Sequence, residues 1–221
     1  MKRILEACCT DAAQARKALK NGASRIELCE QLEVGGVTPS EENIRGCRAV
    51  GIPVNVLIRP RGGDFVYNDI EIAQMVDSVC MCRRLYVNGV VVGALLPDGN
   101  VDIETMRRLI DAARGNTGLI YLPGRMVDPL PPVRELTFHR AFDRCSDPFR
   151  ALEDIISLGF DRILTSGLKP TVPEGLELLS ELVRRADGRI IIMPGSGVNR
   201  DNLDSVAAAT GATEFHGTRI V

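Results

Sequence analysis

Eight short apolar segments recur along the chain, and each is separated from the next by a longer stretch with helical periodicity. Short apolar runs bounded by turn residues are typical of buried strands, and apolar residues three and four positions apart are typical of helices. The predicted strands are Ile4–Cys9, Arg25–Glu30, Pro53–Arg59, Gly89–Leu95, Glu135–Phe142, Arg162–Ser166, Arg189–Pro194 and Glu214–Gly217. The predicted helices are Asp11–Asn21, Ser40–Val50, Asp69–Tyr86, Ile103–Ala113, Pro148–Leu158, Glu174–Ala186 and Arg200–Thr210. This alternation favours a parallel sheet, because parallel strands need a crossover between them.

The number of strand–helix units predicts a TIM-like (β/α)8 barrel that occupies residues 1–221 as a single domain. A doubly wound open sheet is the alternative, but that fold usually has fewer strands and a glycine-rich loop after the first one. Here the first strand is followed by Cys9-Thr10-Asp11, which contains no glycine. The barrel is therefore the preferred prediction.

Two segments depart from an ideal barrel. The stretch 115–134 contains four prolines and predicts an irregular excursion between the fourth helix and the fifth strand. The chain ends at Val221, just beyond the last predicted strand, so we expect the eighth helix to be missing. Without it, the apolar flanks of the first and last strands would be exposed until a subunit or another segment covered them. We therefore expect a homo-oligomer, a dimer or a tetramer.

Composition excludes several classes of protein. The 27 basic and 29 acidic residues are mixed along the chain without a basic tract, which argues against nucleic-acid binding. No stretch approaches 18 apolar residues, and the apolar run at the N-terminus is too short for a signal peptide, so we expect no membrane association. The seven cysteines are odd in number and lack the spacing of a disulfide framework, which predicts a cytoplasmic protein with free thiols.

Strand alternation predicts which side chains face the barrel interior. In a parallel barrel one face of each strand meets the helices and must be apolar. In the second strand Ile26 and Leu28 must be that face, which turns Glu27 and Cys29 inward. The same rule predicts an interior made of Glu6, Cys8, Glu27, Cys29, Asn55, Arg59, Thr137, His139, Ser166, Glu214 and His216.

Charged residues gather where the third strand ends. The segment RPRGGDF (59–65) follows an apolar run directly, and charged groups at such a position are costly unless they are paired or used. Both histidines of the chain also have inward parity near the carboxyl ends of strands, where barrel active sites lie. The predicted site consists of Glu6, Glu27, Arg59, Arg61, Asp64, His139, Asp143 and His216. A purely structural network of ion pairs is the alternative.

Two cysteines suggest a metal site. Cys8 and Cys29 lie on neighbouring strands, roughly 4.8 Å apart, and each stands two residues beyond an inward glutamate. Thiolates at such a separation suit Cu(I), although a buried free cysteine is commonly only a small apolar residue. Met193 is a further soft donor. The segment Cys80-Met81-Cys82 falls on a predicted helix, where residues two apart face different sides, so we predict that it packs in the core.

A short glycine-containing turn follows the seventh strand. Barrels of this class commonly bind phosphate through the loops after strands seven and eight, because glycine lets backbone N–H groups approach an anion. Gly195, Ser196 and Gly197 are therefore candidates for an anion site, to which Thr218 could add a hydroxyl. A tight turn into the next helix is the alternative.

Several segments carry a family resemblance. They are LEACCTD (5–11), GASRIELCEQLEVGGVTPS (22–40), PVNVLIRPRGGDFVYND (53–69), GVVVGALLPDGNVD (89–102), LTFHRAFDRCSDP (136–148), DRILTSG (161–167) and GATEFHG (211–217). In these segments the chain resembles the CutC family, whose members are named copper homeostasis proteins. The resemblance implies a cytosolic TIM-like barrel, usually a homo-oligomer, that binds copper, with Cys8 and Cys29 as the candidate Cu(I) ligands. It implies no defined enzymatic reaction.

The chain departs from the family pattern in three places. The family usually has three glycines where this chain has Gly195-Ser196-Gly197, and 115–134 replaces a much shorter connection. After His216 the family typically continues for a further helix.

Three functional hypotheses follow. The first is a cytosolic copper homeostasis protein that binds Cu(I) at Cys8 and Cys29. The second is a barrel enzyme, an isomerase, lyase or hydrolase, that acts on a small carboxylate or phosphate. In it Arg59 and Arg61 would clamp the anion, and His139 with Glu27 or Asp143 would move protons. The third is an assembly scaffold that retains a vestigial site.

Overall fold

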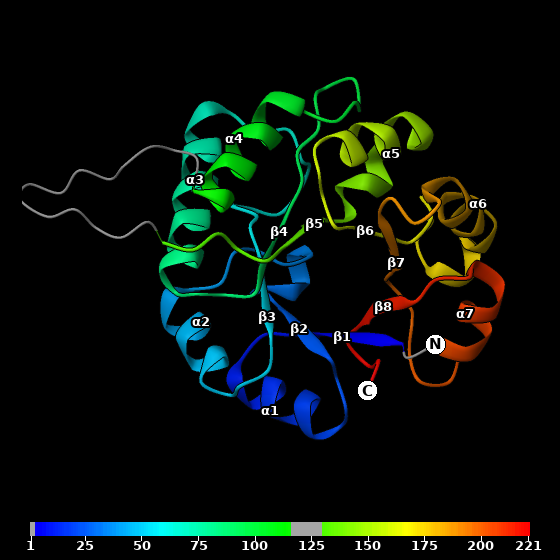
Figure 1. The fold of residues 1–221 in the computed structure, drawn as a ribbon, viewed down its shortest axis with the longest axis horizontal. Coiled ribbons are helices and arrows are strands. Elements are labelled where there is room, and N and C mark those ends of the chain that lie inside the picture. The colour runs from blue at the N-terminus through cyan, green and yellow to red at the C-terminus, as the bar shows by residue number, and fades with distance from the viewer. Residues whose placement is uncertain (1–2, 116–129) are drawn as a thin grey trace, which may run out of the picture.

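The computed structural model describes residues 3–115 and 130–221, in which eight parallel strands surround a common interior and helices lie outside them (Figure 1). The strands are β1 (Ile4–Cys9), β2 (Arg25–Leu28), β3 (Val54–Leu57), β4 (Gly89–Val92), β5 (Glu135–Phe138), β6 (Arg162–Thr165), β7 (Ile191–Pro194) and β8 (Glu214–Gly217). The helices are α1 (Ala12–Lys20), α2 (Glu41–Arg48), α3 (Asp69–Arg84), α4 (Ile103–Arg114), α5 (Pro148–Ser157), α6 (Leu176–Ala186) and α7 (Leu203–Thr210). Short 3₁₀ helices occupy Leu32–Val34, Arg140–Arg144 and Val172–Glu174. The predicted TIM-like barrel is confirmed.

The barrel is nearly closed. The strands neighbour one another in the order β7-β6-β5-β4-β3-β2-β1-β8, and isolated parallel bridges, Gly195 with His216 and Asn199 with Arg219, join the two ends of the sheet. A Cβ atom added to Gly195 would lie 2.3 Å from Cδ1 of Leu164. Glycine is therefore needed at this position, because the end of β7 passes close to a side chain of β6.

The predicted elements are confirmed, and most differences concern their ends. Helix α7 begins at Leu203 rather than Arg200, because the Asn199 side chain accepts hydrogen bonds from the N–H groups of Asp201 and Asn202 and forms a turn there. Ser40 caps α2 by accepting from Asn43, and Asp147 caps α5 by accepting from two N–H groups. Side-chain hydrogen bonds to backbone N–H groups therefore fix the starts of α2 and α5.

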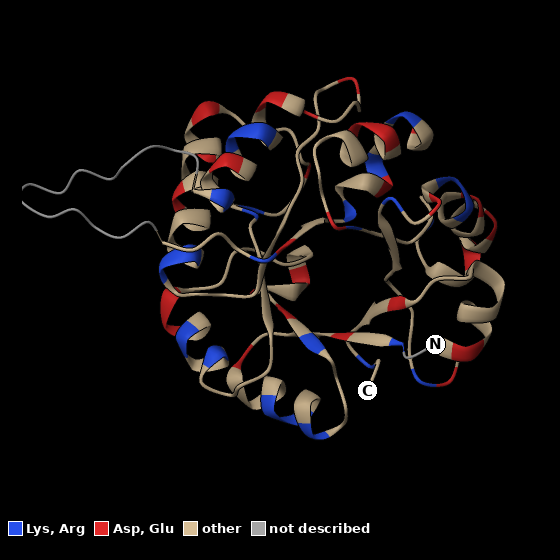
Figure 2. Ribbon diagram, viewed as in Figure 1, with Lys and Arg blue, Asp and Glu red and all other residues tan. Residues whose placement is uncertain are grey.

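The alternation of side chains is confirmed as well. The outward residues of β2, Ile26 and Leu28, are fully buried in the core between strands and helices. The inward residues Cys8, Cys29, Leu57 and Val91 form a separate small apolar cluster inside the barrel. Figure 2 shows charged positions on β1, β2 and β8 around the interior, in addition to those on the outer helices. The interior is thus partly apolar and partly charged.

The flanks of β1 and β8 are covered by other segments of the chain itself, which is one of the two kinds of cover that the sequence led us to expect. No helix follows β8 within residues 130–221, yet Ala7, Cys9 and Phe215 are at most 4% exposed, and Ile220 is also buried. Helix α1 and the segment after β8 contribute to this cover. An exposed apolar flank therefore gives no argument for an oligomer.

The predicted excursion at 115–134 lies mostly outside the described residues, which resume at Leu130 and reach β5 without another helix or strand. Among the helices of residues 3–115 and 130–221, none combines the length and the apolar character that crossing a bilayer requires.

Candidate functional site

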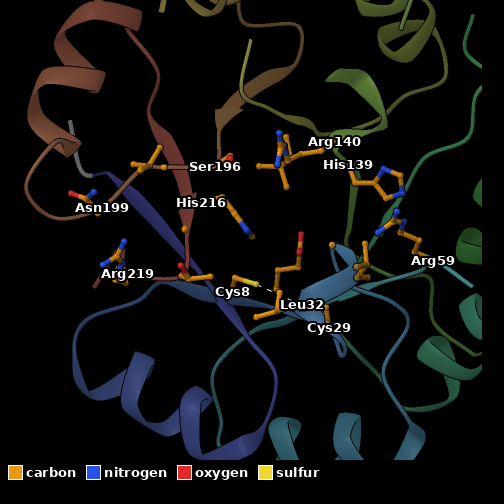
Figure 3. Close-up of a pocket in the computed structure, with 18 of the residues that line it drawn as sticks. Cys8, Cys29, Leu32, Arg59, His139, Arg140, Ser196, Asn199, His216 and Arg219 are labelled. Carbon is orange, nitrogen blue, oxygen red and sulfur yellow. Dashed lines mark hydrogen bonds between the residues drawn. The ribbon is translucent and has the colours of Figure 1, made fainter. Parts of the chain in front are cut away.

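A cavity of about 350 Å³ opens among the carboxyl ends of the strands (Figure 3). It is lined by Cys8, Glu27, Cys29, Leu32, Gly35, Leu57, Arg59, Phe65, His139, Arg140, Leu164, Ser196, Gly197, Val198, Asn199, His216, Gly217, Thr218 and Arg219. Most of the residues that the sequence placed in a site therefore share one enclosure. A pocket of this size and position is typical of small-molecule sites in barrels.

Beneath the cavity lies a network of buried ion pairs. Arg25 pairs with Glu6 and, at 2.5 Å, with Glu214, while Arg162 pairs with Glu214 at 3.1 Å and with Glu135 at 2.9 Å. Strand parity gives Arg25 and Arg162 inward positions, but the sequence analysis did not single them out because both stand at the starts of strands. The network pairs the buried charges of the lower barrel. For Glu6 it corresponds to the alternative named in the sequence analysis, a purely structural network of ion pairs.

Glu6 links this network to the cavity through His216. Its carboxylate lies 2.9 Å from Nδ1 of His216, and it is fully buried. Burial alone would raise the pKa of Glu6, but the hydrogen bond with His216 and the charge of Arg25 offset it and lower the pKa to about 2. Burial opposes protonation of His216, yet the neighbouring Glu27 and Glu6 raise the pKa of its imidazole. A charged His216 beside an ionised Glu6 is therefore favoured.

Glu27 occupies a different environment in the same cavity. Its side chain is buried, and Oε2 has no hydrogen-bond partner among the described residues. The pKa of Glu27 is raised to about 7, mainly by burial and also by the charge of Glu6, while His216 and Arg25 act in the opposite direction. The prediction that Glu27 faces the interior is confirmed.

Cys8 and Cys29 lie together in the cavity, although the register of β1 and β2 places Cys8 opposite Glu27 and Cys29 two residues further along. Their sulfur atoms are 3.7 Å apart, and the ligand atoms of Cys8, Cys29 and Glu27 all lie within 4.8 Å of one another. The hydrogen bond with Cys29 raises the pKa of the Cys8 thiol, and burial and Glu27 raise it further. Without a bound cation, Cys8 therefore holds its proton at neutral pH. Met193 lies below in the ion-pair network, with its sulfur 3.2 Å from Arg25.

His139 is a buried neutral histidine. Nδ1 accepts a hydrogen bond from the N–H of Ala141 at 3.1 Å and thereby caps the 3₁₀ helix Arg140–Arg144. Burial lowers the pKa of His139 to about 3, and the charge of Arg59 acts in the same direction. Nε2, which must carry the hydrogen in this tautomer, has no partner among the described residues. A Cβ atom at Gly93 would lie 2.6 Å from Nδ1, so the residue that follows β4 must be glycine.

Arg59 lines the cavity, but its terminal nitrogens are already in use. They donate to the carbonyl oxygens of Val34, Gly36 and Gly63 at 3.0, 2.9 and 2.9 Å. The guanidinium also lies 4.9 Å from the ring centre of Phe65. Arg59 therefore joins the loops after β2 and β3, and only Nε is left without an acceptor.

Arg61 and Asp64 do not line the cavity. Arg61 donates to the carboxylate of Glu71 at the start of α3 and pairs with Asp64 at 3.0 Å, while its side chain is 38% exposed. The predicted clamp of Arg59 and Arg61 is thus not formed, because the two guanidinium groups bind different partners. The RPRGGD segment is a structural loop whose arginines order its own backbone.

Asp143 is also occupied by structural contacts. It accepts hydrogen bonds from the Thr165 hydroxyl and the Ser166 N–H, and Arg140 pairs with it at 2.7 Å. With Asp64 it lines a neighbouring open groove instead of the cavity. The position of Asp143 does not support the predicted role in proton transfer.

The turn after β7 contributes to the cavity in part. Ser196 and Gly197 line it, whereas Gly195 packs against Leu164 and His216. Ser196 has a φ of 85°, which a non-glycine residue rarely adopts, and its hydroxyl donates to the carbonyl of Pro170 at 3.0 Å. Thr218 lines the cavity as well.

The sequence analysis missed Arg140, Asn199 and Arg219 in the cavity lining. Arg140 directly follows the inward His139 at the carboxyl end of a strand, and this position could have predicted that Arg140 lines the cavity. Asn199 and Arg219 come together only through the bridge between the segments after β7 and β8. Of the five remaining cysteines, Cys9, Cys47, Cys82 and Cys145 are buried as predicted, at most 7% exposed. Cys80 packs against the core but is partly exposed.

Comparison with known proteins gives a consistent result. The CutC family pattern matches residues 3–221. A CutC family protein of Parabacteroides distasonis is 48% identical over 218 residues, which cover 98% of this chain and 82% of the relative. The copper homeostasis protein cutC homolog of Homo sapiens is 42% identical over 214 residues, covering 96% and 72%. The solved structure of a copper homeostasis protein CutC from Streptococcus agalactiae has a TM-score of 0.87 at 33% identity and covers 99% of this chain and 100% of that chain.

Proposed function

This chain belongs to the CutC family, and we propose that it serves copper homeostasis by binding one Cu(I) ion between Cys8 and Cys29. The observation that carries the proposal is the distance of 3.7 Å between the two sulfur atoms in the cavity. Cu(I) is a soft cation that prefers thiolate ligands, and the name copper homeostasis protein is borne by relatives of this chain.

The thiol pair fits a single metal ion. The sulfur–sulfur distance is shorter than twice a metal–thiolate bond, which is about 2.3 Å for zinc, so one ion can contact both sulfurs. The apolar neighbours Leu57 and Val91 pack against the pair and limit the access of water. A soft, partly apolar site of this kind favours Cu(I) over harder cations.

Glu27 and His216 distinguish the site from a simple dithiol. Glu27 lies within 4.8 Å of both sulfurs, and its oxygens also approach Glu6 and His216 at that distance. A carboxylate is a hard ligand that suits zinc better than Cu(I), so we assign Glu27 a role beside the site and not in it. When bound, Cu(I) would supply the positive charge that lets both thiols ionise next to this carboxyl group.

A competition titration tests the proposal. The purified chain is titrated with Cu(I) against a colorimetric Cu(I) chelator, and we expect one ion bound per chain. The Cys8→Ser, Cys29→Ser double variant should lose this binding, whereas Cys80→Ser, which removes a partly exposed thiol on α3, should not. Equal Cu(I) affinity of the double variant and the parent chain would refute the proposal.

The proposal places the protein in the cytoplasm, where thiols remain reduced and available to a metal. All seven cysteines are free, which supports this location. A homo-oligomer, and the absence of nucleic-acid and membrane partners, stay predictions from the sequence.

The enzyme hypothesis loses its proposed anion clamp, because Arg61 points to Glu71 instead of the cavity. No reaction class is therefore proposed.

A further inference from the structure

The cavity wall carries more positive charge than its carboxylates can balance. Three arginines line it, and Arg140 is paired with Asp143. Arg59 and Arg219 form no ion pair with any residue that the structure describes. Glu27 is the single acidic residue among those that line the cavity. Two of the arginines that line this cavity therefore have no ion-pair partner in the part of the chain that the structure describes.

The unpaired charge of Arg59 is the more costly of the two, because Arg59 is only 5% exposed. Carbonyl oxygens satisfy its terminal N–H groups but do not cancel its charge, and its Nε–H has no acceptor within residues 3–115 and 130–221. A buried charge without an opposite charge is costly, and buried charges in proteins are normally paired. A ligand that brings negative charge into the cavity would remove this cost.

His139 adds a second unused donor on the same side. It is 4% exposed, its Nδ1 accepts from Ala141, and the hydrogen on Nε2 has no acceptor among the described residues. Arg59 and His139 lie beside each other in Figure 3, and both contact Phe65, at 4.9 and 5.0 Å from its ring centre. Two buried donors without acceptors in the described part of the chain thus lie side by side behind one wall of the cavity.

The opposite wall presents donors as well. Arg219 is exposed at the rim, on the other side of the cavity from Arg59 and His139 in Figure 3. Its neighbours in the lining, Gly197 and Val198, have backbone N–H groups for which no acceptor is found among the residues that the structure describes. Positive charge and hydrogen-bond donors therefore lie on both sides of the cavity, whose volume is about 350 Å³.

We propose that the cavity binds a small organic dianion, whose one acidic group meets Arg219 and the Gly197–Val198 turn and whose other acidic group meets Arg59 and His139. Carboxylate and phosphate groups share the required chemistry, since each presents several acceptor oxygens to fixed N–H donors. The ligand spans the upper cavity and stays clear of Glu27, whose carboxyl group would repel it. Binding of the dianion at the cavity walls does not require copper binding by the thiol pair.

Isothermal titration at constant ionic strength in sodium chloride tests the proposal. Succinate and acetate form one matched pair of probes, and phosphoglycolate and inorganic phosphate form another. We expect the two-ended member of at least one pair to bind at least about tenfold more tightly than its one-ended partner, since each charge-assisted contact adds affinity. The pair of probes in which the two-ended anion binds more tightly shows whether the site prefers carboxylate or phosphate groups. If neither two-ended anion binds, or if each binds no better than its partner, the proposal is overturned.

Variants locate the site. Arg219→Gln should weaken binding of the two-ended anion by about tenfold, and Arg219→Lys should restore part of it. Arg107→Gln removes the same charge from the exposed face of α4 and should leave the affinity unchanged. Equal affinity of Arg219→Gln and the parent, or an equal loss in Arg107→Gln, would refute the assignment. Arg59 holds two loops together, so its substitution is not the deciding experiment.

The Cys8→Ser, Cys29→Ser variant separates the two proposals. It should lose Cu(I) binding and retain binding of the dianion. Loss of both in a variant that remains folded by circular dichroism would mean that the anion binds through the thiols and not through the arginine walls.

Discussion

Replacing Arg25 with methionine should destabilise the protein by about 3 kcal/mol, because Arg25 joins two buried carboxylates. Arg25 is 5% exposed and pairs with Glu6 and Glu214, which are 0% and 8% exposed. Removing one partner of a buried ion pair costs about 3–5 kcal/mol, since the remaining charge stays in a poorly solvating environment. Methionine keeps much of the side-chain volume, so the loss should reflect charge more than packing.

The pKa of Glu6 gives a second route to the same magnitude. Its pKa falls from an ordinary 4.5 to about 2 in the folded chain, a shift worth about 3 kcal/mol at about 1.36 kcal/mol for each pKa unit. Arg25 and His216 share this effect, so the two routes agree only in order of magnitude. A lowered pKa stabilises the fold above the ordinary pKa, and this contribution is lost as the pH falls from 4.5 toward 2. Without Arg25 the pKa of Glu6 in the folded chain should lie closer to 4.5, so less stability should be lost between pH 4.5 and 2.

Urea unfolding followed by far-ultraviolet circular dichroism measures both effects. The free energy of unfolding should fall by about 3 kcal/mol at pH 7 without a change in the denaturant slope. The control is Arg45→Met, which breaks an exposed pair with Glu41 on α2 and should cost no more than about 0.5 kcal/mol. The reasoning is refuted if Arg25→Met costs less than 1 kcal/mol or if its stability depends on pH as the parent's does.

Three further predictions concern the cavity. Burial raises the pKa of Glu27 from its ordinary 4.5 to about 7, so ionisation of this carboxyl group lowers the stability of the fold as the pH rises from 4.5 through 7. The Glu27→Gln variant should therefore have a larger free energy of unfolding in urea than the parent at pH 8. Equal stability of the two proteins at pH 8 would contradict this prediction. Gly93→Ala should cost about 1–3 kcal/mol, because the added Cβ would displace His139, and an unchanged melting temperature would argue against this. Cu(I) affinity should fall as the pH decreases, by up to about a hundredfold per pH unit if both Cys8 and Cys29 lose protons on binding; pH-independent affinity would show that the thiols are not the ligands.

Strand parity predicted the interior of the barrel well. Every side chain assigned to the interior in β1 and β2 lies there, and the sulfurs of Cys8 and Cys29 are in contact. Parity succeeds because it is a local property with a period of two that holds along any strand. The same rule gave an inward position to Arg25, and an analysis of each strand from its first residue would have predicted the ion pairs.

The loops were predicted less well. The sequence places Arg59, Arg61 and Asp64 within six residues, which suggested a shared role. In the structure Arg59 binds carbonyl groups of the loop after β2, while Arg61 turns to Glu71 on α3. Loop side chains choose partners that come near only after the barrel has closed, and no periodic pattern records those partners.

The sequence alone determined the barrel, the inward thiols and the family, because alternating apolar patterns and long matching segments are properties of the chain in order. Tertiary structure decided which charges are balanced. All three arginines line one cavity, but only Arg140 has a carboxylate partner among the residues that the structure describes, whereas Arg59 and Arg219 have none there. That distinction depends on distances between segments far apart in the chain, and it separates a structural arginine from one that remains available to a ligand.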